Sequence, residues 1–171
     1  MSILEVIKER RSVRRFLSKA IPKEMVEALI EAIIWAPSAG NLQSRKFYFV
    51  YNKEVKDKLA KAAWGQGFIA EAPLVVVACC DLRIGTYYGS RGKDLYTIQD
   101  VAASVQNLLL VAQELGLATV WVGAFDEKEA SDTLQLPTYL RPTAIIPVGY
   151  PAEHPTAPRR APREKAVTFI E

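Results

Sequence analysis

Arginine is concentrated near both ends of the chain. The first cluster is the run RRSVRRF at 10–16, and the second occupies 159–165. Guanidinium groups present forked pairs of N–H donors, and together with the hydroxyl of Ser12 they suit a phosphate group. A simpler alternative is that Arg10 and Arg11 only complement the negative C-terminal end of a preceding helix. The two clusters predict a site for a small phosphorylated ligand.

The charge of the whole chain leaves nucleic acid open as a second kind of partner. The formal net charge is +3, because 22 basic residues stand against 19 acidic ones. A basic patch is compatible with DNA or RNA, but no helix-turn-helix, zinc-finger or single-strand-binding pattern accompanies it, and the aromatic residues are not interleaved with the arginines. We therefore expect a small anionic ligand and no nucleic-acid partner.

Two further segments consist mainly of small and amide residues. They are APSAGNLQ at 36–43 and WVGAF at 121–125. Small residues let a planar ring approach the backbone, and amide side chains offer donors and acceptors to the edge of that ring. The alternatives are a plain turn that ends a helix for the first segment, and a strand-to-helix turn capped by Asp126 for the second. With the arginines, these segments predict grip and orientation for a bound cofactor.

The side chains that several enzyme classes require are missing from the sequence. The one histidine, His154, lies among prolines, so Ser-His-Asp or Cys-His nucleophiles and ordinary zinc sites are nearly excluded. The only cysteines, Cys79 and Cys80, are adjacent in an apolar run and are expected to fill the core. The glycines match neither the dinucleotide-binding fingerprint nor the P-loop. Such a chain can still be an enzyme if a cofactor carries the reaction.

Helices and strands that alternate along the chain must position these segments. Apolar residues at helical spacing indicate helices, one of them with Pro22 at its first position, and β-branched runs indicate strands. Length and composition suit a single domain over 1–171. The expected helices span 2–11, 22–34, 53–63, 96–115 and 126–134, and the expected strands span 47–51, 74–80, 117–122 and 143–148.

Two segments are expected to be less regular. The glycine-rich stretch 81–93 is predicted to be a mobile loop that covers the site with Tyr87 and Tyr88, the alternative being a disordered connection. Prolines keep 151–162 extended, and 166–170 is predicted to form one more strand. Because that strand is reached only through a long extended tail, residues 151–171 are expected to form an arm that is exchanged with a partner subunit.

The helix at 96–115 is apolar on nearly every side after Asp100. Such a helix must be buried all round, which favours a helix that belongs both to the core and to a dimer interface, over the alternative of a central core helix. No apolar run approaches the roughly 18 residues that span a bilayer, and charge at the start replaces the apolar stretch of a secretion signal. We expect a cytoplasmic protein without a membrane partner.

Taken together, these motifs resemble the nitroreductase family of FMN-dependent flavoproteins. The resemblance covers essentially the whole chain and rests on RRSVRRF, APSAGNLQ, the long apolar helix, WVGAF, and the closing VGYP at 148–151 with its arginine tail. It implies an α+β sandwich with a central mixed sheet flanked by helices, in an intertwined homodimer. It also implies two FMN sites at the subunit interface, each built from both chains, and NADH or NADPH as the electron donor.

The resemblance also implies roles for individual residues. Arg10, Ser12 and either Arg159 or Arg160 match the phosphate site, with Arg11 beside them. Arg14 matches the basic position near the N1 and O2 edge of the flavin, where a fixed cation stabilises the charge left by reduction. The remaining matches are the loop that contacts the ring from the partner subunit, at Pro37, Ser38, Ala39, Asn41 and Gln43, and the turn whose backbone N–H meets flavin N5, at Val122, Gly123 and Ala124.

The implied activity is a reductase that alternates between two substrates. NADH or NADPH reduces bound FMN and leaves, and a nitroaromatic, quinone or similar electron-poor compound then takes the electrons. The alternatives are a specialised flavin dehydrogenase or dehalogenase on the same fold, and a flavin-binding protein without turnover. Because the chain is short for this family and has no inserted helical excursion over the site, its substrate stays open.

Overall fold

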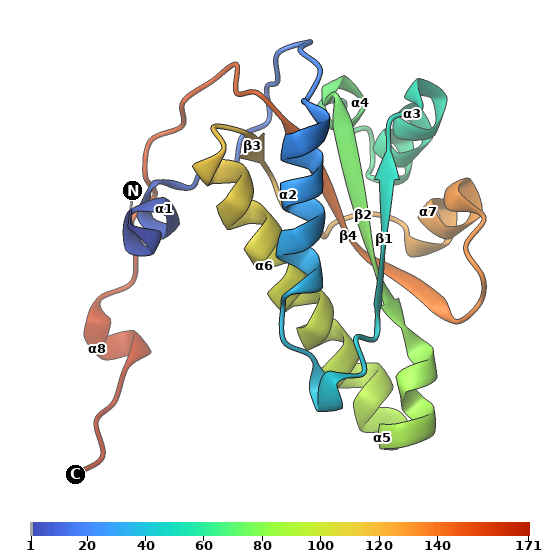
Figure 1. The fold of residues 1–171 in the computed structure, drawn as a ribbon, viewed down its shortest axis with the longest axis vertical. Coiled ribbons are helices and arrows are strands. Elements are labelled where there is room, and N and C mark those ends of the chain that lie inside the picture. Colours follow the sequence, from blue (N-terminus) through green and yellow to red (C-terminus); the bar gives the residue numbers. More distant parts are fainter. Residues whose placement is uncertain (1) are drawn as a thin grey trace.

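The computed structural model describes residues 2–171 and places a central sheet between two layers of helices (Figure 1). α2 and α6 cover one face of the sheet, and α3, α4 and α7 lie on the other. The helices are α1 (Ile3–Glu9), α2 (Lys23–Ile34), α3 (Lys53–Ala62), α4 (Phe68–Glu71), α5 (Gly85–Arg91), α6 (Thr97–Glu114), α7 (Glu127–Leu134) and α8 (Arg163–Ala166). The strands are β1 (Arg45–Val50), β2 (Leu74–Asp81), β3 (Ala118–Thr119) and β4 (Leu140–Gly149).

The four strands lie in the order β1-β2-β4-β3, and each neighbouring pair is antiparallel. One parallel bridge, between Ser12 and Thr119, adds the only parallel pairing that residues 2–171 make, so the sheet is mixed at that point alone. β2 and β4 form the centre and pair from Leu74 opposite Val148 to Asp81 opposite Leu140. The α+β sandwich expected from the sequence is confirmed.

Two apolar layers form because successive residues of a strand point to opposite faces of the sheet. In β2, Val76 and Cys80 pack toward α2 and α6, whereas Val75 and Cys79 pack toward the opposite helices. Both cysteines are free and fully buried, which confirms the expectation that they fill the core. Burial and the neighbouring Cys80 raise the pKa of the Cys79 thiol to about 12.

α6 buries one face against the sheet and leaves the other partly open. Val105 and Leu108 are fully buried, whereas Gln99 and Gln106 are exposed and Leu110 is half-buried. One chain therefore does not bury α6 on all sides, which contradicts the alternative of a central core helix. Because this face is open, a second copy of the chain could cover it. The expectation that a second copy does so remains a prediction.

The segment 81–93 is helical, which corrects the prediction of a mobile loop. Asp81 accepts the backbone N–H of Arg83 at 3.0 Å and so caps a short 3-10 helix, which continues into α5 and then into a π-helical turn at 92–96. Gly89 (φ 57°, ψ −144°) interrupts α5 without ending the helical path. Packing of the Tyr88 and Tyr96 rings, 5.2 Å apart, favours helix over the turn that the glycines indicate.

Three smaller predictions also need correction. Pro22 precedes the first residue of α2 instead of occupying it. The strand predicted at 117–122 is regular only at Ala118–Thr119, and a single bridge at Val122 follows. The strand predicted at 166–170 is absent from the described tail, which instead forms α8 and then continues without regular structure. That end finds no strand to pair with among residues 2–171.

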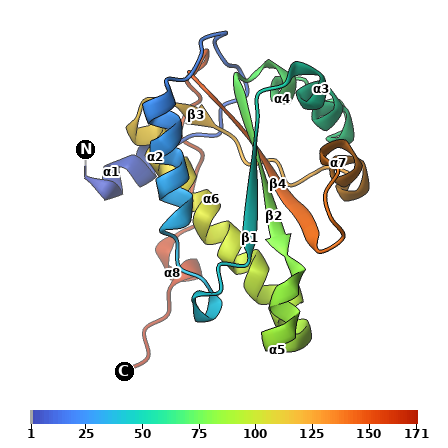
Figure 2. The ribbon, with the colours of Figure 1, turned by 45° about the vertical axis from the view of Figure 1, so that its right-hand side comes forward.

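After β4 the chain turns back along the first segment and then leaves the body of the molecule. The backbone N–H of Ala152 donates to the carbonyl of Arg15 at 2.8 Å, and Phe16 pairs with Pro151. From there the tail passes α1 and ends apart from the sheet (Figures 1 and 2), with Phe169 and Ile170 exposed. None of the helices in residues 2–171 is long and apolar enough to cross a membrane.

Candidate functional site

The first arginine cluster lies beside β3. Arg10 follows the last residue of α1, Ser12 pairs with Thr119, and the backbone N–H of Val13 donates to the carbonyl of Thr119 at 3.0 Å. The chain that carries the arginines therefore runs next to the strand that leads into 121–125. Two of the three segments that the sequence marked as candidates come together at this edge of the sheet.

Arg10 lies among positive charges that lack acidic partners. Burial lowers the pKa of Arg10, and the like charges of Arg160 and Arg11 lower it further. Within residues 2–171, none of the four ion pairs involves these three arginines. Arg160 comes from the tail, so folding brings the second cluster to the first. A bound anion would relieve the repulsion among the guanidinium groups.

The other arginines have different surroundings. Arg11 donates from Nη1 to the carbonyls of Lys8 at 2.6 Å and Arg10 at 2.9 Å, so it caps the end of α1 as the simpler alternative predicted. Arg14 is exposed, and its guanidinium carbon lies 6.0 Å from the centre of the Phe68 ring. Arg159 is exposed in the tail.

The turn at 121–125 presents open backbone. Val122 exchanges two backbone hydrogen bonds with Ile145, at 3.0 and 2.9 Å, and this pairing fixes the start of the turn. Gly123 and Ala124 follow and are exposed. A Cβ atom built on Gly123 would meet only the Trp121 side chain, at 3.8 Å or more, so contacts within residues 2–171 do not require glycine here. Asp126 caps α7, as the alternative for this turn expected.

The loop at 36–43 has an unusual backbone. Gly40, Asn41 and Gln43 all have φ between 52° and 55°, in the left-handed region that L side chains rarely adopt. Ser38 accepts the backbone N–H of Gln43 on its hydroxyl at 3.0 Å. Pro37, Asn41 and Gln43 are exposed, and Ser38 and Ala39 are half-buried. The plain turn considered as an alternative would not need three residues in the left-handed region.

Two charged residues that the sequence did not single out as site residues hold this loop. The buried carboxylate of Asp100, 4% exposed, accepts the backbone N–H of Ala39 at 2.9 Å and the hydroxyl of Ser44 at 2.7 Å. The guanidinium of Arg45 donates to the carbonyls of Ile34 and Ala36, at 3.0 and 2.9 Å, and of Pro37 at 3.2 Å. The acid of Asp100 in a long apolar helix is a signal that could have pointed to it.

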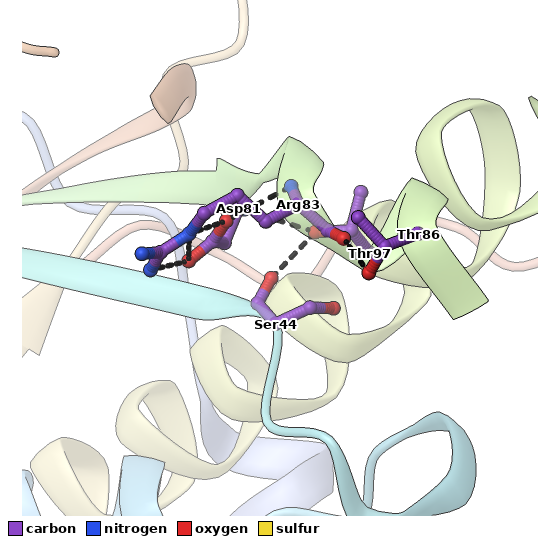
Figure 3. A network of polar contacts seen from close by, with 5 residues as sticks. All are labelled: Ser44, Asp81, Arg83, Thr86 and Thr97. Carbon is purple, nitrogen blue, oxygen red and sulfur yellow. Dashed lines mark hydrogen bonds and ion pairs between the residues drawn. The ribbon is translucent and has the colours of Figure 1, made fainter. Parts of the chain in front are cut away.

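A polar network ties the ends of β1 and β2 to the first turn of α6 (Figure 3). The hydroxyl of Thr97 donates to the carbonyl of Ser44 and accepts the backbone N–H of Asp81 at 3.2 Å. Arg83 forms an ion pair with Asp81, and its hydrogen bonds hold the pKa of that carboxyl below its ordinary value. The network fixes the sheet at the edge from which the loop leaves.

A groove of about 700 Å³ opens beside Gln43, between the edge of the sheet and the helical segment that follows β2. Tyr87 lines the groove, whereas Tyr88 lies against Gly40. The helical segment thus reaches the loop, and the expectation that it covers a bound ligand stays a prediction. The groove is also lined by Arg45, Lys46, Tyr48, Arg83, Tyr139 and Leu140.

The arginine cluster and the 36–43 loop lie at opposite ends of α6 (Figures 1 and 2). Asp100, in the first turn, binds the loop, whereas Thr119, shortly after the last turn, binds the arginine segment. The 18 residues of α6 make a helix about 27 Å long. One chain therefore joins the arginines to the 121–125 turn but leaves the loop on the far side of the molecule.

Comparison with known proteins assigns this architecture. The α+β sandwich defines the class of fold, and the sequence profile of the nitroreductase family matches residues 7–82 and 64–150. The chain belongs to the nitroreductase family, which confirms the oxidoreductase family expected from the sequence motifs.

Three similar proteins illustrate the family. A Methanothermobacter thermautotrophicus protein, provisionally named an NADH dehydrogenase or NAD(P)H nitroreductase, is 31% identical over 91% of this chain and 80% of its own length. The FMN reductase [NAD(P)H] of Bacillus subtilis is 27% identical over 95% of this chain and 71% of its own. The structure of the NADPH:FMN oxidoreductase from Vibrio harveyi, complexed with NAD+, has a TM-score of 0.91 and 25% identity, covering 99% of this chain and 77% of that one.

Proposed function

We propose that this protein is an FMN-dependent oxidoreductase. It takes electrons from NADH or NADPH and passes them to nitroaromatic, quinone or similar electron-poor acceptors, with the first substrate leaving before the second binds. FMN, when bound, supplies the hydride chemistry, and the protein supplies binding, orientation and charge. The names of the relatives, an FMN reductase and an NADPH:FMN oxidoreductase among them, support this proposal.

The observation that carries the proposal is the group formed by Arg10, Arg11 and Arg160. Burial lowers the pKa of Arg10, the like charges of Arg160 and Arg11 lower it further, and none of the ion pairs among residues 2–171 involves these arginines. A phosphate group fits such a site because it accepts several charge-assisted hydrogen bonds. We assign Arg10, Ser12 and Arg160 to the phosphate, with Arg11 and Arg159 beside them.

The surroundings of this cluster suit the rest of FMN. The exposed Arg14 offers a cation to the edge of the ring where reduction leaves negative charge. The free space at Gly123 allows a planar group to approach the backbone of Val122, Gly123 and Ala124. These features favour the proposed binding mode over a bare anion site, which would not need the open turn.

We further propose that a second copy of the chain completes each site. α6, a helix about 27 Å long, separates the arginine cluster at one of its ends from the loop at the other. The loop residues concerned are Pro37, Ser38, Ala39, Asn41 and Gln43. A homodimer that packs the open face of α6 against its partner would bring the loop of one chain to the arginines of the other. The exposed tail end, with Phe169 and Ile170, would form the exchanged arm.

The first experiment is an absorbance spectrum of the purified protein, followed by release of any chromophore. The proposal expects an oxidised flavin spectrum and FMN at about one per chain. Steady NADH or NADPH oxidation that depends on an added quinone then separates an enzyme from a flavin-binding protein without turnover. A colourless protein that takes up no added FMN would overturn the proposal.

Mixing two inactive variants tests the shared site. One variant carries R10A and R160A, and the other carries N41A and Q43A in the loop. If each site combines the arginines of one chain with the loop of the other, a mixed dimer contains one intact site, so random mixing restores about a quarter of the sites. The two variants are unfolded together and refolded so that mixed dimers can form. A refolded mixture that stays as inactive as its components would contradict the shared site.

A further inference from the structure

Loop 36–43 keeps a backbone that its own residues do not favour. Gly40, Asn41 and Gln43 are in the left-handed region, where a side chain costs conformational energy. Asn41 and Gln43 are exposed, so burial of their side chains does not hold them. Such a conformation persists only where neighbouring groups fix it.

Asp100 fixes the loop by accepting hydrogen bonds from donors in the loop and directly after it. Its two carboxylate oxygens are divided between the N–H of Ala39 and the hydroxyl of Ser44, at 2.9 and 2.7 Å. A buried carboxylate needs such donors, because its charge has lost its water. The loop is thereby attached to α6 in its middle, at Ala39, and directly after its last residue, at Ser44.

Arg45 fixes the same loop by donating hydrogen bonds to backbone carbonyls. Its guanidinium binds the carbonyls of Ile34, Ala36 and Pro37, which are left free where α2 ends. Burial lowers the pKa of Arg45, and the charge of Asp100 offsets part of that shift. An anion therefore holds the N–H side of the segment and a cation holds its carbonyl side.

We propose that Asp100 and Arg45 are positioning residues that hold loop 36–43 in the shape that completes the flavin site of a partner subunit. The inference rests on the proposed function, because the loop has a flavin to contact only if the chain binds FMN as a dimer. Neither residue needs to touch the cofactor. Because they fix the loop before FMN binds, less conformational entropy is lost when FMN binds.

D100N tests this role, because the amide keeps one acceptor oxygen and replaces the other with a donor. S104A is the matched control: Ser104 is buried on α6 and donates to the backbone carbonyl of Asp100 at 3.1 Å, and no hydrogen bond among residues 2–171 joins its hydroxyl to the loop. The first readout is amide hydrogen exchange at Ala39 and Gln43 in the FMN-free protein. The second is FMN affinity, measured by quenching of flavin fluorescence.

We expect D100N to speed exchange at both amides, and to weaken FMN binding, by roughly tenfold or more each. S104A should leave both unchanged even if it lowers the melting temperature as much as D100N does. R45K should act in the same direction as D100N, because an ammonium cannot reproduce the fork that binds several carbonyls. If D100N does not fold, S44A removes one donor and keeps the charge.

The outcomes separate this inference from the proposed function. A wild-type protein that binds no FMN overturns the proposed function, whatever the exchange rates are. A wild-type protein that binds FMN, together with a D100N variant that keeps wild-type exchange and affinity, overturns the positioning role. Faster exchange in D100N with unchanged FMN affinity also overturns it, because the loop would then be held without consequence for the site.

Discussion

Tyr88 places its hydroxyl against the backbone of Gly40, in the space that a Cβ atom of residue 40 would occupy. The two residues come from different parts of the chain, since Tyr88 is on α5 and Gly40 is in the loop that follows α2. Glycine is therefore favoured at position 40 for two reasons. Its φ of 55° disfavours a side chain, and a Cβ atom there would force the Tyr88 hydroxyl to move.

The first prediction concerns this contact and compares G40A with G65A. Gly65 also has a left-handed backbone, with φ of 80°, but no heavy atom of residues 2–171 lies within 4 Å of the position that a Cβ atom would take there. G65A should cost about 1 kcal/mol in the free energy of unfolding, and G40A clearly more. Urea unfolding measures both. In a Y88F background the extra cost of G40A over G65A should shrink. If G40A and G65A cost the same in the wild-type background, the contact between Tyr88 and Gly40 does not contribute.

The second prediction concerns the exposed guanidinium of Arg14. R14Q should lower the two-electron reduction potential of bound FMN by about 30 mV or more, because a cation near the ring stabilises its reduced form. The loss of FMN affinity should be smaller than the loss in rate of reduction by NADH or NADPH. R15Q changes the net charge equally and is the control. The same shift in both variants would point to net charge instead of a specific contact.

The third prediction ranks the two tail arginines. Arg160 is close enough to Arg10 to lower its pKa, whereas Arg159 does not contribute to that shift. R160A should weaken FMN binding by about 10-fold to 100-fold, and R159A by much less. Fluorescence titration at two salt concentrations measures both affinities. The reverse order would move the phosphate contact to Arg159.

The fourth prediction is a pH dependence that comes from Cys79. Its pKa rises from 9.0 to about 12 on burial, so the folded chain keeps the proton where the unfolded chain releases it. The stability of the fold should therefore be unaffected by this group below pH 9 and fall between pH 9 and 12, by roughly 1.4 kcal/mol per pH unit. Urea unfolding across that range, for wild type and C79A, checks it. A variant that loses stability as steeply as wild type would assign the loss to other groups.

Local patterns in the sequence determined much of the fold and the family. The continuous apolar run of β2 predicted a strand whose two cysteines fill the core, and the apolar spacing of α2 and α6 predicted two helices whose ends the structure confirms within a few residues. These predictions succeed because the spacing of apolar side chains is a local property of the sequence. In the folded chain the same apolar side chains are the ones that become buried. The arginine run and the two small-residue segments pointed to the family for a similar reason, since each is contiguous.

Other features depended on residues that are far apart in the sequence. No local pattern indicates that Asp100 binds Ala39 across 61 positions, or that Tyr88 fills the space at Gly40. In the glycine-rich segment after β2, which is helical, Tyr88 packs against both the nearby Tyr96 and the distant Gly40. The sequence by itself marked the segments that we propose to hold the cofactor. Only the tertiary structure decided that the rigid length of α6 keeps the loop and the arginine cluster of one chain apart.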